Sequence, residues 1–155
     1  MVNPDTLKIL KPLLKRHEGL RLKPYKCSAD KWPIGYGHNL EAHPIVGRTL
    51  QDLQKNGITL QEAETLLGGD ITLAIDDARA LVPSFYLLSP VRQAVLIDMV
   101  FNLGNTRLTG FRKFLKAVFE EDFKTASKEM LSSKWALQVK SRATRLARMM
   151  ETGQQ

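Results

Sequence analysis

Glu18 is the residue of this chain whose neighbours best suit it to donate a proton. It ends a segment, residues 5–18, whose leucines and isoleucine recur with helical spacing, and Gly19 follows as a stop signal. A carboxyl group in the last turn of a helix lies near the negative end of the helix dipole, which disfavours ionisation and raises its pKa. Such a group can protonate a leaving oxygen, as glycoside hydrolysis requires. The alternative is that Glu18 is an ordinary surface charge.

The segment after Glu18 predicts the only β-structure of the chain. Residues 22–43 mix turn-forming glycines and prolines with aromatic and β-branched residues, a pattern typical of short strands. We expect a small antiparallel sheet of two or three strands. Pro33 falls within it, and because proline has no N–H, its strand must be an edge strand or carry a bulge.

The remainder of the sequence predicts helices. A capping box formed by Thr59 and Glu62 starts a helix over 59–81, which the pair Gly68-Gly69 can kink. Ser89 and Pro90 start another helix, whose residues 91–103 are apolar on most sides and therefore indicate the buried centre of a bundle. Further helices fit residues 110–120, 122–132 and 134–150. The fold class is thus α+β and mostly α, with an N-terminal lobe over 1–58, a connecting helix over 59–81 and a helical C-terminal lobe over 82–155.

The composition shows an excess of basic charge. The 155 residues include 23 Lys and Arg against 16 Asp and Glu, a net charge of +7. This charge suits an anionic partner such as nucleic acid, a membrane surface or a bacterial envelope, and it is also compatible with a solvated basic face that has no specific partner. Cys27 is the single cysteine, which excludes an internal disulfide. The three histidines lack metal-binding spacing, so we expect no metal and no cofactor.

The sequence contains no apolar run long enough for a membrane-spanning helix, and its N-terminus lacks the basic-then-apolar layout of a secretory signal. We therefore expect a protein that is made in the cytoplasm without a signal peptide and is not inserted in a membrane. If it acts on the cell wall, something else must release it.

The stretch from Glu18 to His38 resembles the N-terminal active-site segment of the phage-type lysozymes, the endolysins that cut the glycan strands of peptidoglycan. The family pattern runs Glu-Gly-x-Arg-Leu-x-x-Tyr, then Asp or Cys, then Thr-Ile-Gly-Tyr-Gly-His. Its catalytic Glu falls on Glu18, its second catalytic position on Cys27 and its threonine on Pro33. The residues of this chain that match the pattern are Glu18, Gly19, Arg21, Leu22, Tyr25, Ile34, Gly35, Tyr36, Gly37 and His38.

The resemblance covers residues 7–150 and is not confined to that segment. Residues 58–70 fit the start of the helix that joins the two lobes in this family, residues 98–104 resemble its buried helix and the turn that follows, and residues 133–148 resemble its C-terminal helices. The resemblance therefore implies one lysozyme domain over 1–155, and a monomer.

The resemblance also implies roles for individual residues. Arg142 is expected to orient Glu18 from the C-terminal lobe. His38 is expected to pair with Asp70 and to tie the sheet to the connecting helix. The pairing should raise the pKa of His38, so its contribution to stability would be lost as the pH climbs through that raised value. The expected substrate-binding residues are Tyr25, Asn102 and Gln138.

Two residues depart from the family pattern in a way that affects catalysis. A thiol at Cys27 is a poor general base at neutral pH, but it can place a water or contact the sugar; the alternative is a small, half-buried hydrophobic residue. Pro33 has neither the hydroxyl with which a threonine can hold the attacking water nor an N–H. Asp30 lies three residues after Cys27 and three residues before Pro33. We hypothesise that Asp30 partly supplies the missing base, the alternative being a solvent-exposed turn aspartate.

The resemblance implies a muramidase that cleaves the β-1,4 bond between N-acetylmuramic acid and N-acetylglucosamine, with inversion, and thereby aids bacterial lysis. Its partner would be bacterial peptidoglycan, reached through a separate holin-like pore. The alternative is a catalytically impaired lysozyme-fold protein that binds peptidoglycan, because of Pro33.

Two other functions are compatible with the basic charge alone. One is a helical nucleic-acid binder, but the chain contains no recognised nucleic-acid motif and we expect no specific nucleic-acid partner. The other is a cationic amphipathic helix over 134–150 that acts on membranes. Ordinary packing of that helix onto the bundle explains the same apolar residues.

Overall fold

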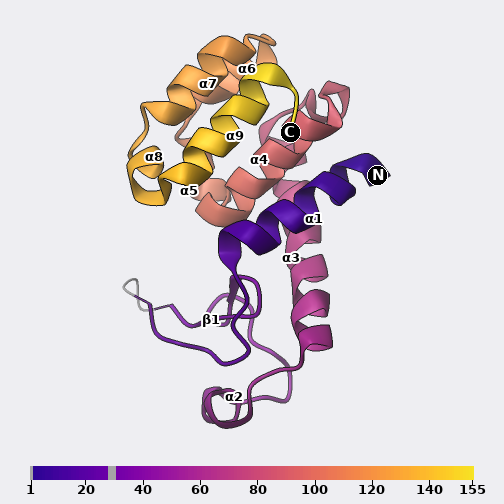
Figure 1. Cartoon of the computed structure of the whole chain (residues 1–155), viewed down its shortest axis with the longest axis vertical. Helices are drawn as coiled ribbons and strands as arrows, with labels where there is room; N and C mark the ends of the chain where they lie inside the picture. Colours follow the sequence, from indigo (N-terminus) through magenta and orange to yellow (C-terminus); the bar gives the residue numbers. More distant parts are fainter. Residues whose placement is uncertain (1, 28–30) are drawn as a thin grey trace. The chain divides into compact units, whose positions relative to one another are not determined.

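The computed structural model describes residues 2–27 and 31–155, and Figure 1 labels its α-helices and the first strand, β1. The chain divides into two compact units. The sheet unit consists of residues 12–72, and the helical unit combines residues 1–11 with residues 73–155. Both divisions fall inside helices, so α1 (Pro4–Glu18) and α3 (Leu60–Leu81) each contribute to both units.

The last turns of α1 open the sheet unit and end where the sequence predicted. Gly19 has a φ of 72° and donates its N–H to the carbonyl of Lys15 at 3.0 Å, the usual arrangement of a glycine that follows a helix. Pro12 lies within α1 and does not end it. Glu18 is therefore the final residue of the helix, as expected from its position before the glycine.

The antiparallel sheet has two strands, β1 (Pro33–Ile34) and β2 (His38–Asn39), which pair Pro33 with Asn39 and Ile34 with His38. Gly35 and Gly37 both have positive φ values, 63° and 73°, and these make the tight turn between the strands. The structure confirms the predicted small antiparallel sheet, which has two strands, the smaller of the two numbers expected.

Two further helical segments belong to the sheet unit, a short helix and the first half of α3. Helix α2 (Leu50–Asn56), which the sequence did not predict, is capped by Thr49. The capping box at the start of α3 is confirmed, because Thr59 and Glu62 exchange side-chain-to-backbone hydrogen bonds of 3.0 and 3.1 Å. The helix then runs without interruption through Gly68 and Gly69.

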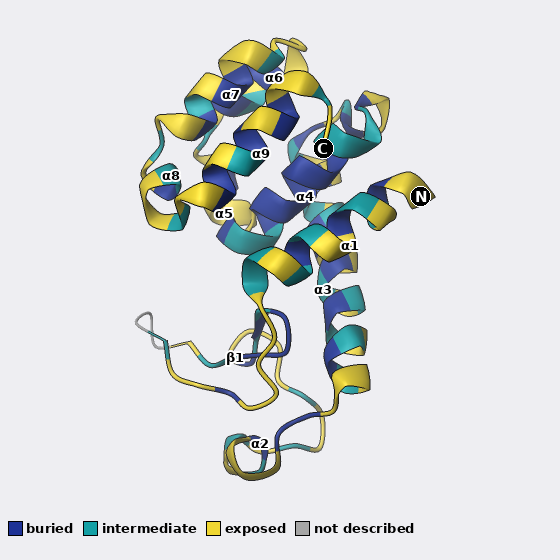
Figure 2. Cartoon of the chain, in the orientation of Figure 1, coloured by how far each residue is buried: buried dark blue, intermediate teal, exposed yellow. Residues whose placement is uncertain are grey.

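The helical unit is built around α4 (Pro90–Leu103). Ser89 caps this helix by accepting a hydrogen bond from the N–H of Arg92 at 3.3 Å, and Pro90 occupies the first helical position, both as predicted. Most residues of α4 are buried, and Figure 2 shows the helix largely in dark blue. The other elements of this unit are η1 (Phe85–Leu87), α5 (Asn105–Thr109), α6 (Arg112–Phe119), α7 (Phe123–Leu131), α8 (Lys134–Val139) and α9 (Ser141–Thr152). Helix α9 packs against α4, α7 and α8, and α7 packs against α6.

The prediction of one helix over 134–150 is wrong, because Lys140 separates α8 from α9. Lys140 has a φ of 52°, a backbone conformation that breaks an α-helix, while its N–H still donates to the carbonyl of Ala136 at 2.9 Å. The break lets the apolar side chains of both helices reach the core. These residues are Trp135, Leu146, Met149 and Met150, all at most 4% exposed.

This packing also bears on the membrane-active alternative. The apolar residues that a membrane-bound helix over 134–150 would need are mostly inside the bundle, although Leu137 is 79% exposed. Among the helices of residues 2–27 and 31–155, none combines the length and the apolar character needed to cross a bilayer.

Candidate active site

Glu18 is a half-buried residue whose carboxyl group lies against the turn between the two strands. A Cβ atom built on Gly37 would come within 3.0 Å of Cδ and 3.1 Å of Cγ of Glu18, and closer still to Oε1. The end of α1 and the β1–β2 turn therefore meet at this carboxyl group. Only a residue without a side chain leaves room for it there.

The last turn of α1 is held by a residue that the sequence did not single out. Lys15 contacts Oε1 of Glu64 on α3 through its Nζ at 2.5 Å, and the same ammonium group lies 5.4 Å from the centre of the Tyr36 ring. The hydrogen bond to Glu64 is the main reason that the pKa of Lys15 is raised. Within the sheet unit this pair fixes the helix turn that carries Glu18.

Pro33 occupies a position at which its missing N–H does not disturb the sheet. Leu40 donates its N–H to the carbonyl of Trp32 at 3.3 Å, so in the alternating antiparallel ladder the Pro33–Asn39 pair is a non-hydrogen-bonded one. On the other side of β1, Arg21 and Gly35 form an isolated bridge that does not continue to Pro33. The position at the edge agrees with the expectation for a proline in a strand.

Cys27 is half-buried and donates its backbone N–H to the carbonyl of Lys31 at 3.0 Å. Asp30, the carboxylate that we hypothesised as an auxiliary base, lies outside the described residues.

Tyr25 is 42% exposed, and the guanidinium of Arg21 lies over its ring, 4.6 Å from the ring centre. This stacking gives the tyrosine a fixed, accessible face.

His38 is buried and lies between two hydrogen-bond acceptors. Its Nδ1 is 2.8 Å from Oδ2 of Asp70 and its Nε2 is 2.7 Å from the carbonyl oxygen of His43. Burial lowers the pKa of His38, but the hydrogen bonds to Asp70 and to the His43 carbonyl, together with the charge of Asp70, outweigh it and raise the pKa overall. Because both ring nitrogens face acceptors, the doubly protonated imidazolium satisfies both contacts at once.

The other three candidate residues belong to the helical unit, and each is bound by a residue that the sequence analysis missed. Nε1 of Trp135 donates to Oδ1 of Asn102 at 2.6 Å. Nη2 of Arg107 donates to Oε1 of Gln138 at 3.2 Å.

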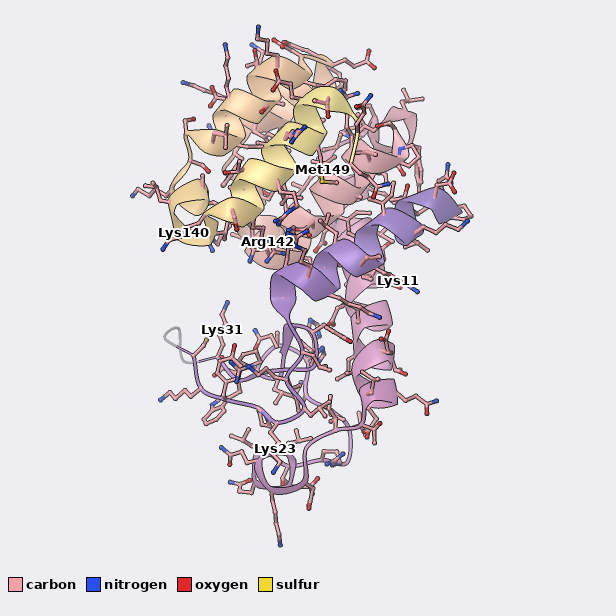
Figure 3. All side chains as sticks on the ribbon, in the orientation of Figure 1. Lys11, Lys23, Lys31, Lys140, Arg142 and Met149 are labelled. Carbon is pink, nitrogen blue, oxygen red and sulfur yellow. The ribbon has the colours of Figure 1, made fainter. Side chains whose placement is uncertain are left out.

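Arg142 makes the third of these contacts. Its Nε and Nη2 lie 3.0 and 2.9 Å from Oδ1 of Asp98. All three contacts join a residue of α4 or α5 to a residue of α8 or α9, and we call them the polar seam. Figure 3 labels Arg142, which comes from α9.

A sequence signal for part of the polar seam exists. Asp98 and Asn102 are four residues apart on a helix that is otherwise apolar nearly all round, and polar groups buried on such a helix need partners. The indole N–H of a buried Trp135 has the same requirement. The sequence does not show which residue is the hydrogen-bond partner of each of these three side chains.

Metal binding finds no support in this geometry. Within the described residues, no three His, Cys, Asp or Glu side chains gather in a way that holds a metal ion.

Comparison with known proteins identifies the class to which this fold and site belong. Residues 15–149 match the family described as phage lysozyme, and the chain therefore belongs to that family. It is accordingly a lysozyme-type peptidoglycan hydrolase, an enzyme of the glycosidase type.

Relatives come from both cellular and viral sources. Probable T4-type lysozyme 1 of Dictyostelium discoideum is 30% identical over 160 residues, which cover 93% of this chain and 94% of that protein. An endolysin of Acyrthosiphon pisum secondary endosymbiont phage 1 is 34% identical over 128 residues, 80% of this chain and 75% of the endolysin. The pre-baseplate central spike protein Gp5 of Enterobacteria phage T4 is 30% identical over 157 residues, which cover 91% of this chain but only 27% of the spike protein.

Proposed function

We propose that the protein is a muramidase that hydrolyses the β-1,4 bond between N-acetylmuramic acid and N-acetylglucosamine, with Glu18 as the general acid. The observation that carries the proposal is the position of Glu18. It is half-buried in the last turn of α1, and its carboxyl group packs on the β1–β2 turn. The negative end of the helix favours the protonated carboxyl that the reaction requires.

In the proposed reaction, Glu18 gives its proton to the glycosidic oxygen as the bond from that oxygen to the anomeric carbon breaks. A water molecule adds to the anomeric carbon from the opposite face, which inverts its configuration, and the proton of that water passes to a base. We assign Cys27 to placing the water and Asp30 to accepting the proton. The net change is the consumption of one water and the appearance of one new reducing end.

The remaining candidate residues have supporting roles in this proposal. We assign Arg142 to orienting the carboxyl group of Glu18, the role that the family resemblance implies. Tyr25, Asn102 and Gln138 bind the glycan. The contact of Tyr25 with the guanidinium of Arg21 and the hydrogen bond from Trp135 to Asn102 support these roles, because a preorganised side chain loses less entropy when a ligand binds.

A second candidate function is favoured by Pro33. This residue supplies neither a hydroxyl nor an N–H at the position where the family has a threonine. A protein with this defect would keep the fold and bind peptidoglycan, but it would cut slowly or not at all.

The test is the release of new reducing ends from purified peptidoglycan, measured beside Glu18→Gln. Glutamine keeps the size of the side chain but has no proton to donate, so release should vanish in the variant while the variant still sediments with the wall. Release that persists in Glu18→Gln rejects Glu18 as the acid. No release from either protein, with wall binding retained, favours the second function.

We also propose that the enzyme takes part in bacterial lysis as a monomer and reaches the wall through a separate holin-like pore. The relative named endolysin supports the first part of this proposal. Expression in bacteria with and without a pore-forming holin tests it: lysis should require both proteins. Lysis by the enzyme alone would contradict the need for a pore.

A further inference from the structure

Lys15 lies where three elements of the sheet unit meet, and Glu18 follows it three residues later on α1. Its ammonium group is 2.5 Å from Oε1 of Glu64 on α3 and 5.4 Å from the centre of the Tyr36 ring in the β1–β2 turn. Its backbone carbonyl accepts the N–H of Gly19, the residue that follows the helix. Lys15 therefore contacts α3 and the β1–β2 turn with its side chain, and the end of α1 with its backbone.

Glu18 contacts the same turn between the strands. Because Lys15 and Glu18 are three residues apart on α1, their side chains lie on the same side of the helix. The ammonium group of Lys15 lies near the ring of Tyr36, and the carboxyl group of Glu18 packs on Gly37, the next residue. The last turn of α1 is thus held against the β1–β2 turn at two neighbouring points.

Helix α3 holds both parts of this contact. A Cβ atom built on Gly35 would lie 3.5 Å from Cβ of Ala63, an ordinary van der Waals distance, so the β1–β2 turn packs on the first turns of α3. Glu64, the next residue of α3, binds Lys15. Two neighbouring residues of α3 therefore hold the β1–β2 turn and the end of α1, and the carboxyl group of Glu18 lies where these two meet.

The ion pair of Lys15 and Glu64 is of a kind that adds little to stability. Their side chains are 36% and 41% exposed, and water weakens the attraction between charges that it reaches to this degree. The hydrogen bond to Glu64 is the main cause of the raised pKa of Lys15, so the ammonium group is charged at neutral pH. The main consequence of the contact is a restricted position for the last turn of α1.

We infer that Lys15 and Glu64 are positioning residues of the hydrolase, which hold the last turn of α1 so that the carboxyl group of Glu18 stays against the β1–β2 turn. The inference rests on the proposed function, in which Glu18 is the general acid. In this role neither residue touches the substrate or the reacting atoms, because both act through the helix turn. A displacement of about 1 Å at a reacting group can cost on the order of 100-fold in rate, so a loosened turn should slow the chemical step.

A double-mutant cycle with Lys15→Met and Glu64→Ala tests the inference. Methionine keeps a long unbranched side chain without the charge, and alanine favours the helix. We expect each single variant and the double variant to lose kcat by a similar factor, about tenfold, because the two residues form one contact. KM on soluble peptidoglycan fragments should stay within about twofold, and Tm should fall by no more than about 4 °C. Losses of kcat that multiply in the double variant, or an effect confined to KM, would overturn the inference.

Lys15→Arg is the conservative variant of the test, and Lys8→Met is the matched control. A guanidinium at position 15 can still bind Glu64 and lie near the ring of Tyr36, so kcat should stay within about threefold of the wild type. Lys8 is also on α1, but it faces Asp5 of the same helix at 4.0 Å and its side chain is 80% exposed. Lys8→Met should therefore leave kcat unchanged. A Lys15→Arg variant as slow as Lys15→Met would overturn the inference, as would an equal loss in Lys8→Met.

The nuclear Overhauser effect between the Hα protons of Gly37 and the Hγ protons of Glu18 provides a readout that does not depend on activity. A Cβ atom on Gly37 would lie 3.1 Å from Cγ of Glu18, so these protons are close in the wild type. The effect should weaken in Lys15→Met and in Glu64→Ala and keep its intensity in Lys8→Met. Unchanged intensity in both Lys15→Met and Glu64→Ala would reject positioning.

These measurements separate the inference from the proposed function. If the wild type releases no reducing ends, or if Glu18→Gln keeps full activity, the proposed function fails, and the nuclear Overhauser effect still tests positioning. If activity depends on Glu18 while Lys15→Met and Glu64→Ala both keep full kcat, the inference alone fails.

Discussion

The carboxyl group of Glu18 packs directly on Gly37, the second glycine of the turn between the two strands. A side chain at position 37 would begin 3.0 Å from Cδ of Glu18, which is shorter than van der Waals contact. Gly37 also has a φ of 73°, which favours glycine for a second reason. One residue thus shapes the turn and leaves the space in which the candidate acid lies.

Gly37→Ala should reduce activity far more than its effect on stability explains. The new methyl group must push the carboxyl of Glu18 aside, and a displacement of about 1 Å at a reacting group can cost on the order of 100-fold in rate. Steady-state kcat on peptidoglycan fragments measures the effect.

Gly47→Ala is the matched control for this prediction. Gly47 has a similar φ of 78°, but a Cβ on it would meet nothing within 4 Å. Both variants should lose about 1 kcal/mol of unfolding free energy from the strained backbone, while only Gly37→Ala should lose kcat. Equal kcat in the two variants would show that the packing of Glu18 on Gly37 does not matter for catalysis.

The His38–Asp70 pair should make stability depend on pH above neutrality. The folded state raises the pKa of His38 above its ordinary value of 6.5. The stabilisation is therefore fully present below pH 6.5 and declines as the pH rises, because the unfolded chain releases the proton first; it is lost above the raised pKa. Urea unfolding at a series of pH values should show this decline, and Asp70→Asn should weaken it.

His43→Gln is the control for that series. The contact from His38 goes to the backbone carbonyl of residue 43, which the substitution leaves in place. The decline of stability with pH should therefore persist in His43→Gln. A wild-type unfolding free energy that does not fall between pH 6.5 and 9 would contradict the raised pKa of His38.

Pro33→Thr should increase the rate of glycan cleavage if the missing hydroxyl limits the enzyme. We expect a gain in kcat of at least about tenfold, since a positioned group that assists proton transfer contributes on the order of 100-fold or more. Pro33→Val distinguishes the hydroxyl from the backbone, because valine restores the N–H and a β-branched shape without an oxygen. A gain shared equally by both variants would assign the effect to the backbone, and no gain in either would show that Pro33 is not the defect.

Arg92 should stabilise the C-terminal end of α9 without affecting catalysis. Its guanidinium lies 3.6 Å from the centre of the Phe123 ring and donates to the carbonyls of Met150 at 2.7 Å and Glu151 at 2.8 Å. Arg92→Met should lower the unfolding free energy by about 1–3 kcal/mol, through the loss of two charge-assisted hydrogen bonds and a cation–π contact. Chemical denaturation measures the change, and kcat should remain that of the wild type.

Arg79→Met provides the comparison for Arg92. Arg79 also lies over a ring, 5.2 Å from the centre of Tyr86, but its side chain is 50% exposed. An exposed contact of this kind contributes less than about 1 kcal/mol. If both variants lose the same stability, the carbonyl contacts of Arg92 do not contribute.

The sequence by itself determined the local features of this protein. The glycine after Glu18, the capping box at Thr59 and Glu62, and the cap at Ser89 are interactions within a few residues, so the residue types suffice to predict where helices begin or end. The motif between Glu18 and His38 likewise predicted the family, since its residues are spaced along one short segment.

The tertiary structure decided what depends on residues far apart in the chain. The break at Lys140 follows from packing Trp135 and Leu146 into one core, and nothing in the residue types around Lys140 signals a positive φ. The pairing of Asp98 with Arg142 spans 44 residues, and that of Trp135 with Asn102 spans 33. A sequence shows that such buried polar groups need partners, but only the packing of the helices selects them, because burial and contact geometry arise when distant segments come together.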